Sequence, residues 1–275
     1  MKRAGLFGLL ALAACAPAQR GEAPRGGPAI VSLNPCTDAI LAEVAAPGQL
    51  RAISHHSQDA AASSMDLAAA QAFPAAGGSV EEVAALYPDV VVTGTFTPPA
   101  TLDAFARLGI RVEQVGIAGT VAESQAQVRR LAALAGQPAR GEALVGRIEA
   151  ALVAATPPDA GRPSAIVWQS GGMVPGEGTL IADLLRRTGF GNAAAARGLR
   201  QADLLPLEAM LADPPRLILA AGNPSSGEDR MLSHPALARL TSTRTERLDP
   251  SLLWCGGPTI IRAANRLAQV RKAVR

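Results

Sequence analysis

The side chains that could bind a ligand follow short apolar runs, at the points where predicted strands end. Asn34 to Thr37 come directly after the run 29–33, and His55 and His56 follow the run 50–54. In parallel sheets, ligands lie beyond the carboxyl ends of the strands. An imidazole there could hydrogen-bond a ligand or fill an open position on its metal, and two surface histidines without a ligand are the alternative. The candidate ligand-binding residues are Asn34, Pro35, Cys36, His55, His56, Phe96, Trp168, Gly172, Met173, Asn223, Trp254 and Cys255.

Aromatic residues make up 3% of this chain, so the two tryptophans stand out. Trp168 ends the apolar run 164–168, and Trp254 lies in a late loop. Large aromatic side chains at such positions suit a flat or apolar ligand, and core packing is the alternative for either one. The glycines of the segment 169–173 (QSGGM) either let the backbone approach a ligand closely or make a turn.

Cys36 and Cys255 lie in predicted loops that belong to opposite halves of the chain. An oxidising compartment would permit a disulfide between them, which needs Cα atoms within about 7 Å of each other. Two independent buried thiols, or two soft ligands to a bound metal centre, are the alternatives. The sequence leaves the three possibilities open.

The composition argues against several classes of function. Lys2 and Arg3 lie in a segment that we expect to be removed, which leaves 24 basic and 23 acidic residues. No basic cluster stands out, so we expect no nucleic-acid binding. The segment 176–178 (GEG) lacks the third glycine of a dinucleotide fingerprint, and the segment 168–172 (WQSGG) is not a nucleophile elbow. Three histidines argue against a His-rich catalytic or zinc site. We expect no enzyme activity, no cofactor and no metal centre of the protein's own.

One long predicted helix separates two stretches in which strand and helix patterns alternate. It begins near Gln137-Pro138, because proline suits the first helical turn, and Thr156-Pro157-Pro158 ends it. Its apolar residues recur at three- and four-residue spacing, which predicts one buried face: Ala143, Leu144, Ile148, Ala151, Leu152 and Ala155. An ordinary crossover helix within one continuous sheet is the alternative.

These patterns predict an α/β protein with two lobes, each with a central, mainly parallel sheet flanked by helices, joined by one long rigid helix. The expected boundaries are an N-terminal lobe at 29–136, the helix at 137–160 and a C-terminal lobe at 161–275. A cleft between two such lobes is where a ligand would bind. The expected strands are 29–33, 50–54, 90–93, 111–115, 164–168, 217–220 and 246–248.

The N-terminus has the order of an export signal: a positive start, a short apolar run and small residues before a cleavage site. Residues 12–15 (LAAC) resemble the lipobox of bacterial lipoproteins, in which the cysteine becomes the lipid-bearing first residue. We therefore expect a signal peptide at 1–14, lipidation of Cys15 and a flexible tether at 15–28. Plain secretion with cleavage near Ala18 is the alternative.

Three segments carry a resemblance to a known family. They are 32–38 (SLNPCTD), 79–92 (SVEEVAALYPDVVV) and 108–112 (LGIRV). They resemble the substrate-binding proteins of iron-siderophore, haem and vitamin B12 ABC importers, and the likeness runs from Ala29 to the C-terminus. The resemblance implies two lobes joined by one long helix. It also implies a periplasmic monomer that hands its ligand to an ABC permease dimer and its ATPase.

The resemblance gives two glutamates an expected role. Glu81 and Glu208 each lie early in a predicted helix, shortly before a proline turn and a buried strand. In this family, glutamates so placed dock on arginines of the two permease subunits, and arginine binds carboxylate bidentately. The alternative is that both acids only favour the starts of their helices.

The expected ligand is a metal chelate or corrinoid, either cobalamin or a ferric siderophore. The absence of a basic cluster disfavours strongly anionic catecholate chelates and favours a corrinoid. His56, at a loop position where cobalamin-binding relatives place an aromatic residue, leaves that choice open. The alternatives are a receptor for a metal ion, an oxyanion or haem on the same fold, and a two-lobed Rossmann-like enzyme such as a glycosyltransferase or dehydrogenase.

Overall fold

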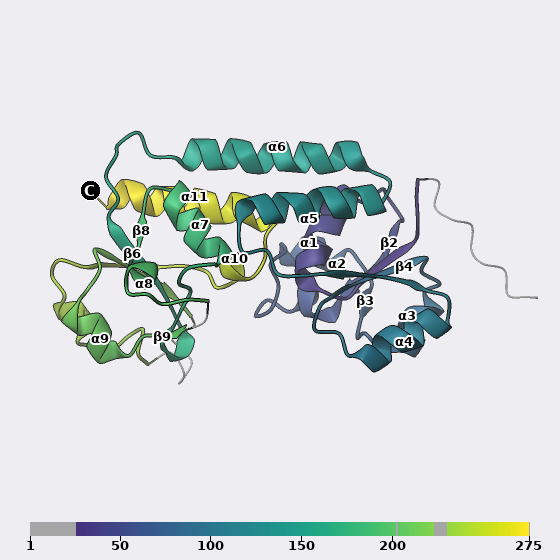
Figure 1. Ribbon diagram of the computed structural model, residues 1–275, viewed down its shortest axis with the longest axis horizontal. Coiled ribbons are helices and arrows are strands. Elements are labelled where there is room, and N and C mark those ends of the chain that lie inside the picture. The colour runs from purple at the N-terminus through teal and green to yellow at the C-terminus, as the bar shows by residue number, and fades with distance from the viewer. Residues whose placement is uncertain (1–25, 202, 223–229, 275) are drawn as a thin grey trace, which may run out of the picture.

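The computed structural model describes residues 26–201, 203–222 and 230–274, which form an elongated molecule with two sheets side by side (Figure 1). The expected signal peptide, the lipidation site Cys15, most of the tether and Asn223 lie outside the described residues. Within the part described, no helix is both long enough and apolar enough to cross a membrane.

The N-terminal lobe contains a five-stranded parallel sheet in the order β3-β2-β1-β4-β5. The middle strands are almost wholly buried, because runs such as Val90-Val91-Val92 are covered by helices on both faces. The strands are β1 (Ile30–Ser32), β2 (Leu50–Ser54), β3 (Ala75–Ala76), β4 (Val90–Gly94) and β5 (Arg111–Val115). The helices are α1 (Pro35–Val44), α2 (Leu67–Gln71), α3 (Val80–Ala85), α4 (Pro99–Arg107) and α5 (Val121–Leu134), with a 3-10 turn η1 (His55–Gln58).

The C-terminal lobe contains a four-stranded parallel sheet in the order β11-β10-β6-β8 and a small antiparallel pair, β7-β9. The strands are β6 (Ser164–Gln169), β7 (Met173–Val174), β8 (Gly191–Asn192), β9 (Asp203–Leu204), β10 (Leu217–Ala221) and β11 (Arg244–Arg247). The helices are α7 (Leu180–Arg187), α8 (Ala193–Ala196), α9 (Leu207–Ala212), α10 (Ser251–Trp254) and α11 (Thr259–Ala273), with 3-10 turns η2 (Ser170–Gly172) and η4 (Leu237–Arg239).

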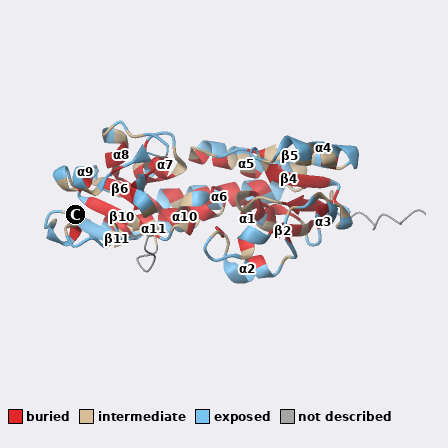
Figure 2. Cartoon of the chain, turned by 90° about the horizontal axis from the view of Figure 1, so that it is seen from below, coloured by how far each residue is buried: buried red, intermediate tan, exposed pale blue. Residues whose placement is uncertain are grey.

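Helix α6 (Pro138–Ala155) spans both lobes and rests on α5 of one and α11 of the other (Figure 1). Its buried face contains Leu144, Ile148, Leu152 and Ala155, while Ala143 of the predicted stripe is exposed. One cluster of buried side chains runs from the N-terminal sheet through α6 into the C-terminal sheet. In Figure 2 the buried residues concentrate on the strands and on the inward faces of these helices. The shared core makes α6 a rigid brace between the lobes.

The predicted two-lobed α/β architecture is confirmed, and the single continuous sheet is excluded for the part of the chain described. The predicted strands 50–54 and 111–115 match β2 and β5. Helix α6 ends at Ala155, five residues before the predicted limit of 160, because prolines at 157 and 158 cannot continue it. The sequence patterns missed the two-residue strands, which have too few residues to show a period.

Candidate functional site

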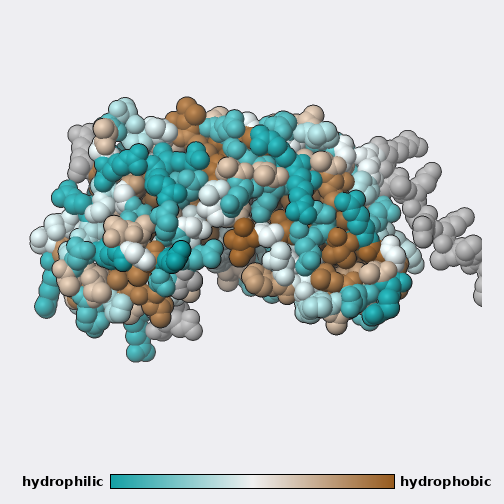
Figure 3. All heavy atoms as spheres, in the orientation of Figure 1, coloured by the Kyte–Doolittle hydropathy of each residue, from teal (hydrophilic) through white to brown (hydrophobic). Residues whose placement is uncertain are grey.

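A cavity of about 410 Å³ lies between the two lobes, and both contribute to its walls. The N-terminal lobe supplies the segments that follow β1, β4 and β5, and the C-terminal lobe supplies the end of β6, the start of α7 and the end of α10. In Figure 3 the lower edge of the molecule is hollowed between its halves. The lining comprises Asn34, Cys36, Thr37, Gly94, Thr95, Phe96, Val115, Gly116, Ile117, Ala118, Gly119, Gln127, Gln169, Pro175, Thr179, Leu180, Ile181, Gln201, Leu253, Trp254 and Gly256.

Asn34 and Thr37 are fixed on the cavity wall by the start of α1. The side-chain oxygen of Asn34 accepts a hydrogen bond from the backbone N–H of Cys36 at 2.8 Å and so caps the helix. The hydroxyl of Thr37 lies 2.7 Å from that of Ser32 at the end of β1. The helix therefore starts directly at the carboxyl end of the strand, where the topology of a parallel sheet places a ligand.

Three large apolar side chains line the cavity and are exposed to solvent. Phe96 follows β4 and is 84% exposed, Ile117 follows β5 and is 71% exposed, and Trp254 ends α10 at 40%. Exposed apolar side chains grouped at a concave site typically mark a place where a ligand or partner binds. Phe96 and Trp254 come from different lobes and line the same cavity.

A disulfide between Cys36 and Cys255 joins the lobes beside this cavity, with a Cα–Cα distance of 4.9 Å. Cys36 lies in the first turn of α1 and Cys255 follows α10. Of the three alternatives left open by the sequence, the structure therefore has the bridged one. Neither sulfur is a free thiolate, so the cysteines are not soft ligands for a metal in the cavity.

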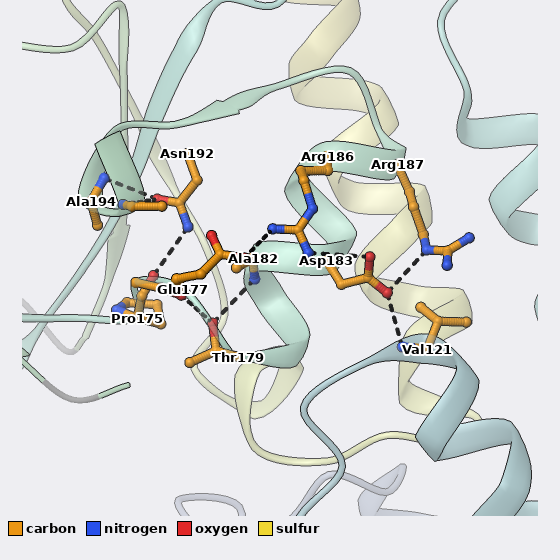
Figure 4. A network of polar contacts seen from close by, with 12 residues as sticks. Val121, Pro175, Glu177, Thr179, Ala182, Asp183, Arg186, Arg187, Asn192 and Ala194 are labelled. Atoms are coloured by element: carbon orange, nitrogen blue, oxygen red, sulfur yellow. Dashed lines mark hydrogen bonds and ion pairs between the residues drawn. The ribbon is translucent and has the colours of Figure 1, made fainter. Parts of the chain in front are cut away.

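Hydrogen bonds cross between the lobes near the same seam. The backbone N–H of Val121 donates to Asp183 at 3.0 Å (Figure 4), and that of Gly257 donates to Ser124 at 2.7 Å. Both contacts are buried. With the disulfide and the shared core, they hold the lobes at a fixed separation, so the cavity is preformed.

Asp38 is a buried carboxylate in α1, one residue beyond Thr37. Its Oδ2 accepts hydrogen bonds from Ser57 Oγ at 2.7 Å and from the backbone N–H of Ser54 at 2.9 Å, whereas Oδ1 has no partner among the described residues. Burial raises the pKa of the Asp38 carboxyl to about 7, against hydrogen bonds that favour its charged form. The carboxyl fastens turn η1 to the wall of the cavity.

Trp168 is a correction to the predicted site. Its side chain is 0% exposed, packs in the core of the C-terminal lobe and donates from Nε1 to the carbonyl oxygen of Leu205 at 3.2 Å. Successive side chains of a strand point to opposite faces, so the next residue, Gln169, lines the cavity instead. The core-packing alternative is therefore the one that applies to Trp168.

The histidines are also outside the cavity lining. His55 and His56 are exposed on turn η1, with ring centroids 3.9 Å apart, and His55 Nδ1 lies 3.2 Å from the carbonyl oxygen of Ala76. Hydrogen bonds from the backbone N–H of Ser54 and from Ser57 Oγ to Asp38 hold this turn against α1. Neither histidine lines this cavity, and their predicted contact with a ligand stays a prediction.

Gly172 and Met173 do not line the cavity either. Gly172 is buried in turn η2, where its carbonyl accepts from the backbone N–H of Leu205 at 2.8 Å, and Met173 lies on β7. Pro35 and Cys255 are adjacent to lining residues without lining the cavity themselves. Of the predicted contacts, Asn34, Cys36, Phe96 and Trp254 lie together at the cavity.

Several lining residues were missed by the sequence reading, notably Gln127, Gln169, Gln201 and Ile117. Ile117 follows the predicted strand 111–115, so the expectation that ligands lie beyond the carboxyl ends of strands could have identified it. Gln127 lies inside α5 and had no such signal. The described residues contain no group of three or more His, Cys, Asp or Glu side chains that could hold a metal ion.

The sequence profile of a family described as periplasmic binding protein matches residues 30–248 of the chain. No curated protein matches the chain. Several solved structures share its fold. The periplasmic haem-binding protein RhuT from Roseiflexus sp. RS-1 has 20% identity and a TM-score of 0.69, and covers 90% of this chain and 98% of its own.

Two proteins of Vibrio cholerae are similar in the same way. The periplasmic haem-binding protein HutB has 17% identity and a TM-score of 0.71 over 88% of this chain and 98% of its own. The periplasmic vitamin B12-binding protein BtuF has 16% identity and a TM-score of 0.68 over 89% of this chain and 96% of its own. These similarities show a shared two-lobed fold among proteins with different ligands.

Proposed function

The chain belongs to the periplasmic binding protein family, and from that premise we propose that it is the substrate-binding component of an ABC importer. It captures a metal chelate or corrinoid in the cavity between the lobes and delivers it to a permease. The matched family is one of periplasmic binding proteins, so the chain's own part in this proposal is capture and delivery.

The observation that carries this proposal is a preformed cavity of about 410 Å³ whose walls come from both lobes. Its volume falls within the range of small-molecule sites. The aromatic side chains Phe96 and Trp254 come from opposite lobes, and they suit a broad ligand with apolar faces. The disulfide between Cys36 and Cys255 limits how far the lobes can separate, so binding relies on a cleft that is already formed.

Delivery requires a surface that the permease recognises, and Glu81 with Glu208 supplies it in this proposal. Both side chains are exposed in the first turns of α3 and α9, and the described residues give neither an ion-pair partner. In Figure 1 these helices lie near opposite ends of the molecule, on the side away from α6. Two separated carboxylates suit arginines on two permease subunits.

The protein is anchored to the membrane through lipid on Cys15, with residues 16–28 as a tether and the lobes in the periplasm. The support is the order of the N-terminal residues: Lys2-Arg3, an apolar run and Leu12-Ala13-Ala14-Cys15. The receptor acts as a monomer, since one chain supplies both walls of the cavity.

The direct test is an absorbance titration of the chain lacking residues 1–15 with cyanocobalamin and with ferric hydroxamates, checked by native mass spectrometry. Saturable binding of one ligand molecule per chain is expected. Binding of neither compound, together with cofactor-dependent turnover of another substrate, would instead support the two-lobed enzyme.

The delivery step is tested with Glu208→Gln in a reconstituted importer. The variant should weaken stimulation of the transporter's ATPase several-fold and leave ligand affinity unchanged, because Glu208 is not among the residues that line the cavity. Glu149→Gln, which alters an exposed glutamate on α6, is the matched control. A large loss of ligand affinity in Glu208→Gln would contradict the docking role.

A further inference from the structure

The cavity between the lobes is lined by uncharged side chains. None of the described lining residues is Asp, Glu, Lys, Arg or His, although 18% of the chain is charged. An ionised carboxylate or catecholate that entered this space would lose water and gain no counter-charge, which costs much free energy. The lining therefore disfavours an anionic ligand.

The same wall has no donor for a metal's open coordination position. Among the residues described there, none is Tyr, His or Met, and the sulfur of Cys36 is committed to the disulfide with Cys255. Iron and cobalt centres take nitrogen, sulfur or anionic oxygen ligands from proteins. A metal bound here must therefore arrive with its coordination positions already filled.

Four primary amides are the strongest polar groups on the wall. Asn34 and Gln127 come from the N-terminal lobe, and Gln169 and Gln201 come from the C-terminal lobe. The side-chain oxygen of Asn34 accepts a hydrogen bond from the backbone N–H of Cys36, and Gln127 Nε2 donates to the carbonyl oxygen of Gly116 at 2.8 Å. Within the described residues no hydrogen bond uses the NH2 of Asn34 or the side-chain oxygen of Gln127, so both can serve a ligand. Each primary amide both donates and accepts, which matches the amides of a ligand.

Two charged side chains of α7, which supplies lining residues at its start, have local partners. Asp183, beside the lining residues of α7, accepts from the backbone N–H of Val121 and from Arg187 (Figure 4). Arg186 pairs with Glu177 at 2.9 Å. Arg186 is therefore engaged by Glu177 and does not line the cavity as a counter-ion for an anionic ligand.

We propose that the ligand is an uncharged metal complex whose metal has every coordination position filled and whose edge carries amide groups. This inference rests on the proposed function and narrows it. Corrinoids with both axial positions occupied and neutral ferric trihydroxamates share this chemistry. Haem, with two carboxylates and open axial positions, and trianionic ferric catecholates do not share it.

The test is a set of parallel calorimetric titrations of the chain lacking residues 1–15. The probes are cyanocobalamin, a neutral ferric trihydroxamate, haemin and a ferric tricatecholate. At least one neutral complex should bind about 100-fold more tightly than both anionic complexes. The neutral complex that binds more tightly shows whether the ligand is a corrinoid or a ferric trihydroxamate. Tighter binding of haemin, with the absorbance bands of axial ligation by a side chain, would overturn the inference while supporting the importer role. Failure of all four would count against the importer role itself.

Gln169→Glu tests the amide set directly. The substitution keeps the shape of the side chain but replaces a donor with a negative charge, so affinity for the neutral ligand should fall about tenfold. Gln71→Glu adds the same charge on exposed helix α2 and should leave affinity unchanged. Circular dichroism and thermal unfolding of both variants check the fold. An unchanged affinity in a folded Gln169→Glu protein would remove Gln169 from the recognition set.

Gln201→Arg tests the missing counter-charge through a gain in affinity for an anionic ligand. Gln201 is exposed at the cavity wall, so a longer side chain can be accommodated without disturbing the core. Arginine would provide the counter-charge that the wall lacks, and affinity for the tricatecholate should rise at least tenfold. If the affinity for this anion does not change in the folded variant, lack of counter-charge is not the reason for its exclusion.

Discussion

Trp168 and Gln169 are neighbours on β6 whose side chains lie in different surroundings. Trp168 points into the core of the C-terminal lobe, and Gln169 faces the cavity. The alternation follows from the pleat of β6, in which successive side chains lie on opposite faces. A shift of one residue along the strand therefore decides whether a side chain packs in the core or lines the cavity.

Asp38 is the residue whose protonation state the fold changes most clearly. Burial raises the pKa of its carboxyl to about 7, above the ordinary value of 3.8. Between these two pH values the folded protein holds the proton more tightly than the unfolded chain does. The free energy of unfolding should therefore fall as pH rises through this window. The reason is that the folded state binds a proton that the unfolded chain has already released, and a rising pH disfavours the state that binds more protons.

The prediction is that Asp38→Asn removes this part of the pH dependence. The amide oxygen of asparagine can still accept hydrogen bonds from Ser54 and Ser57, but the asparagine side chain cannot titrate. The wild type should lose stability relative to the variant by up to about 1.4 kcal/mol per pH unit between pH 5 and 7. Urea unfolding of both proteins at several pH values measures it. Parallel curves for the two proteins would show that Asp38 does not titrate in this range.

At the scale of elements, helix α6 depends on one close approach to α5. A Cβ on Gly141 would lie 2.5 Å from the Cβ of Ala132, well inside van der Waals contact. Glycine lets the two helix backbones pack closely at this crossing, although it lowers intrinsic helix stability. Gly146, on the same helix, has nothing within 4 Å of the corresponding position.

The two glycines make a matched pair for mutation. Gly141→Ala should lower the free energy of unfolding by roughly 1–3 kcal/mol, because the added methyl group forces α5 and α6 apart. Gly146→Ala should raise it by about 0.5–1 kcal/mol, because alanine favours the helix and meets no neighbour. Chemical denaturation measures both. Equal stabilisation by the two substitutions would show that the crossing is loose.

At the scale of the whole molecule, the lobes are held together by a shared core, buried hydrogen bonds and one disulfide. The disulfide joins residues 219 positions apart in the sequence. Closing so long a loop restricts the unfolded chain strongly, which is the usual account of how a disulfide stabilises a fold. It also lies beside the cavity, where separation of the lobes would change the site.

Cys36→Ser/Cys255→Ser, made in the chain lacking residues 1–15, should lose about 2–5 kcal/mol of unfolding free energy. Denaturant unfolding with and without reductant is the measurement. The wild type should become less stable on reduction, whereas the double variant should be insensitive to it. Two free thiols per oxidised wild-type chain under denaturation would contradict the bridge.

The sequence by itself determined the two-lobed architecture, the long helix and most strand positions. These features depend on local patterns: apolar runs, three- and four-residue spacing, capping residues and prolines at 157 and 158. The positions of Asn34, Cys36 and Phe96 after predicted strands also indicated the segments that line the cavity. Each of these signals lies within a short window of the chain, which is why the sequence carries it.

Only the tertiary structure decided which candidates meet. It packed Trp168 in the core, left His55 and His56 out of the cavity lining, and joined Cys36 to Cys255. It also brought four amides together from distant segments. The physical reason is that the orientation of a side chain at a strand end depends on strand register and on packing between lobes, and neither is encoded in a local pattern.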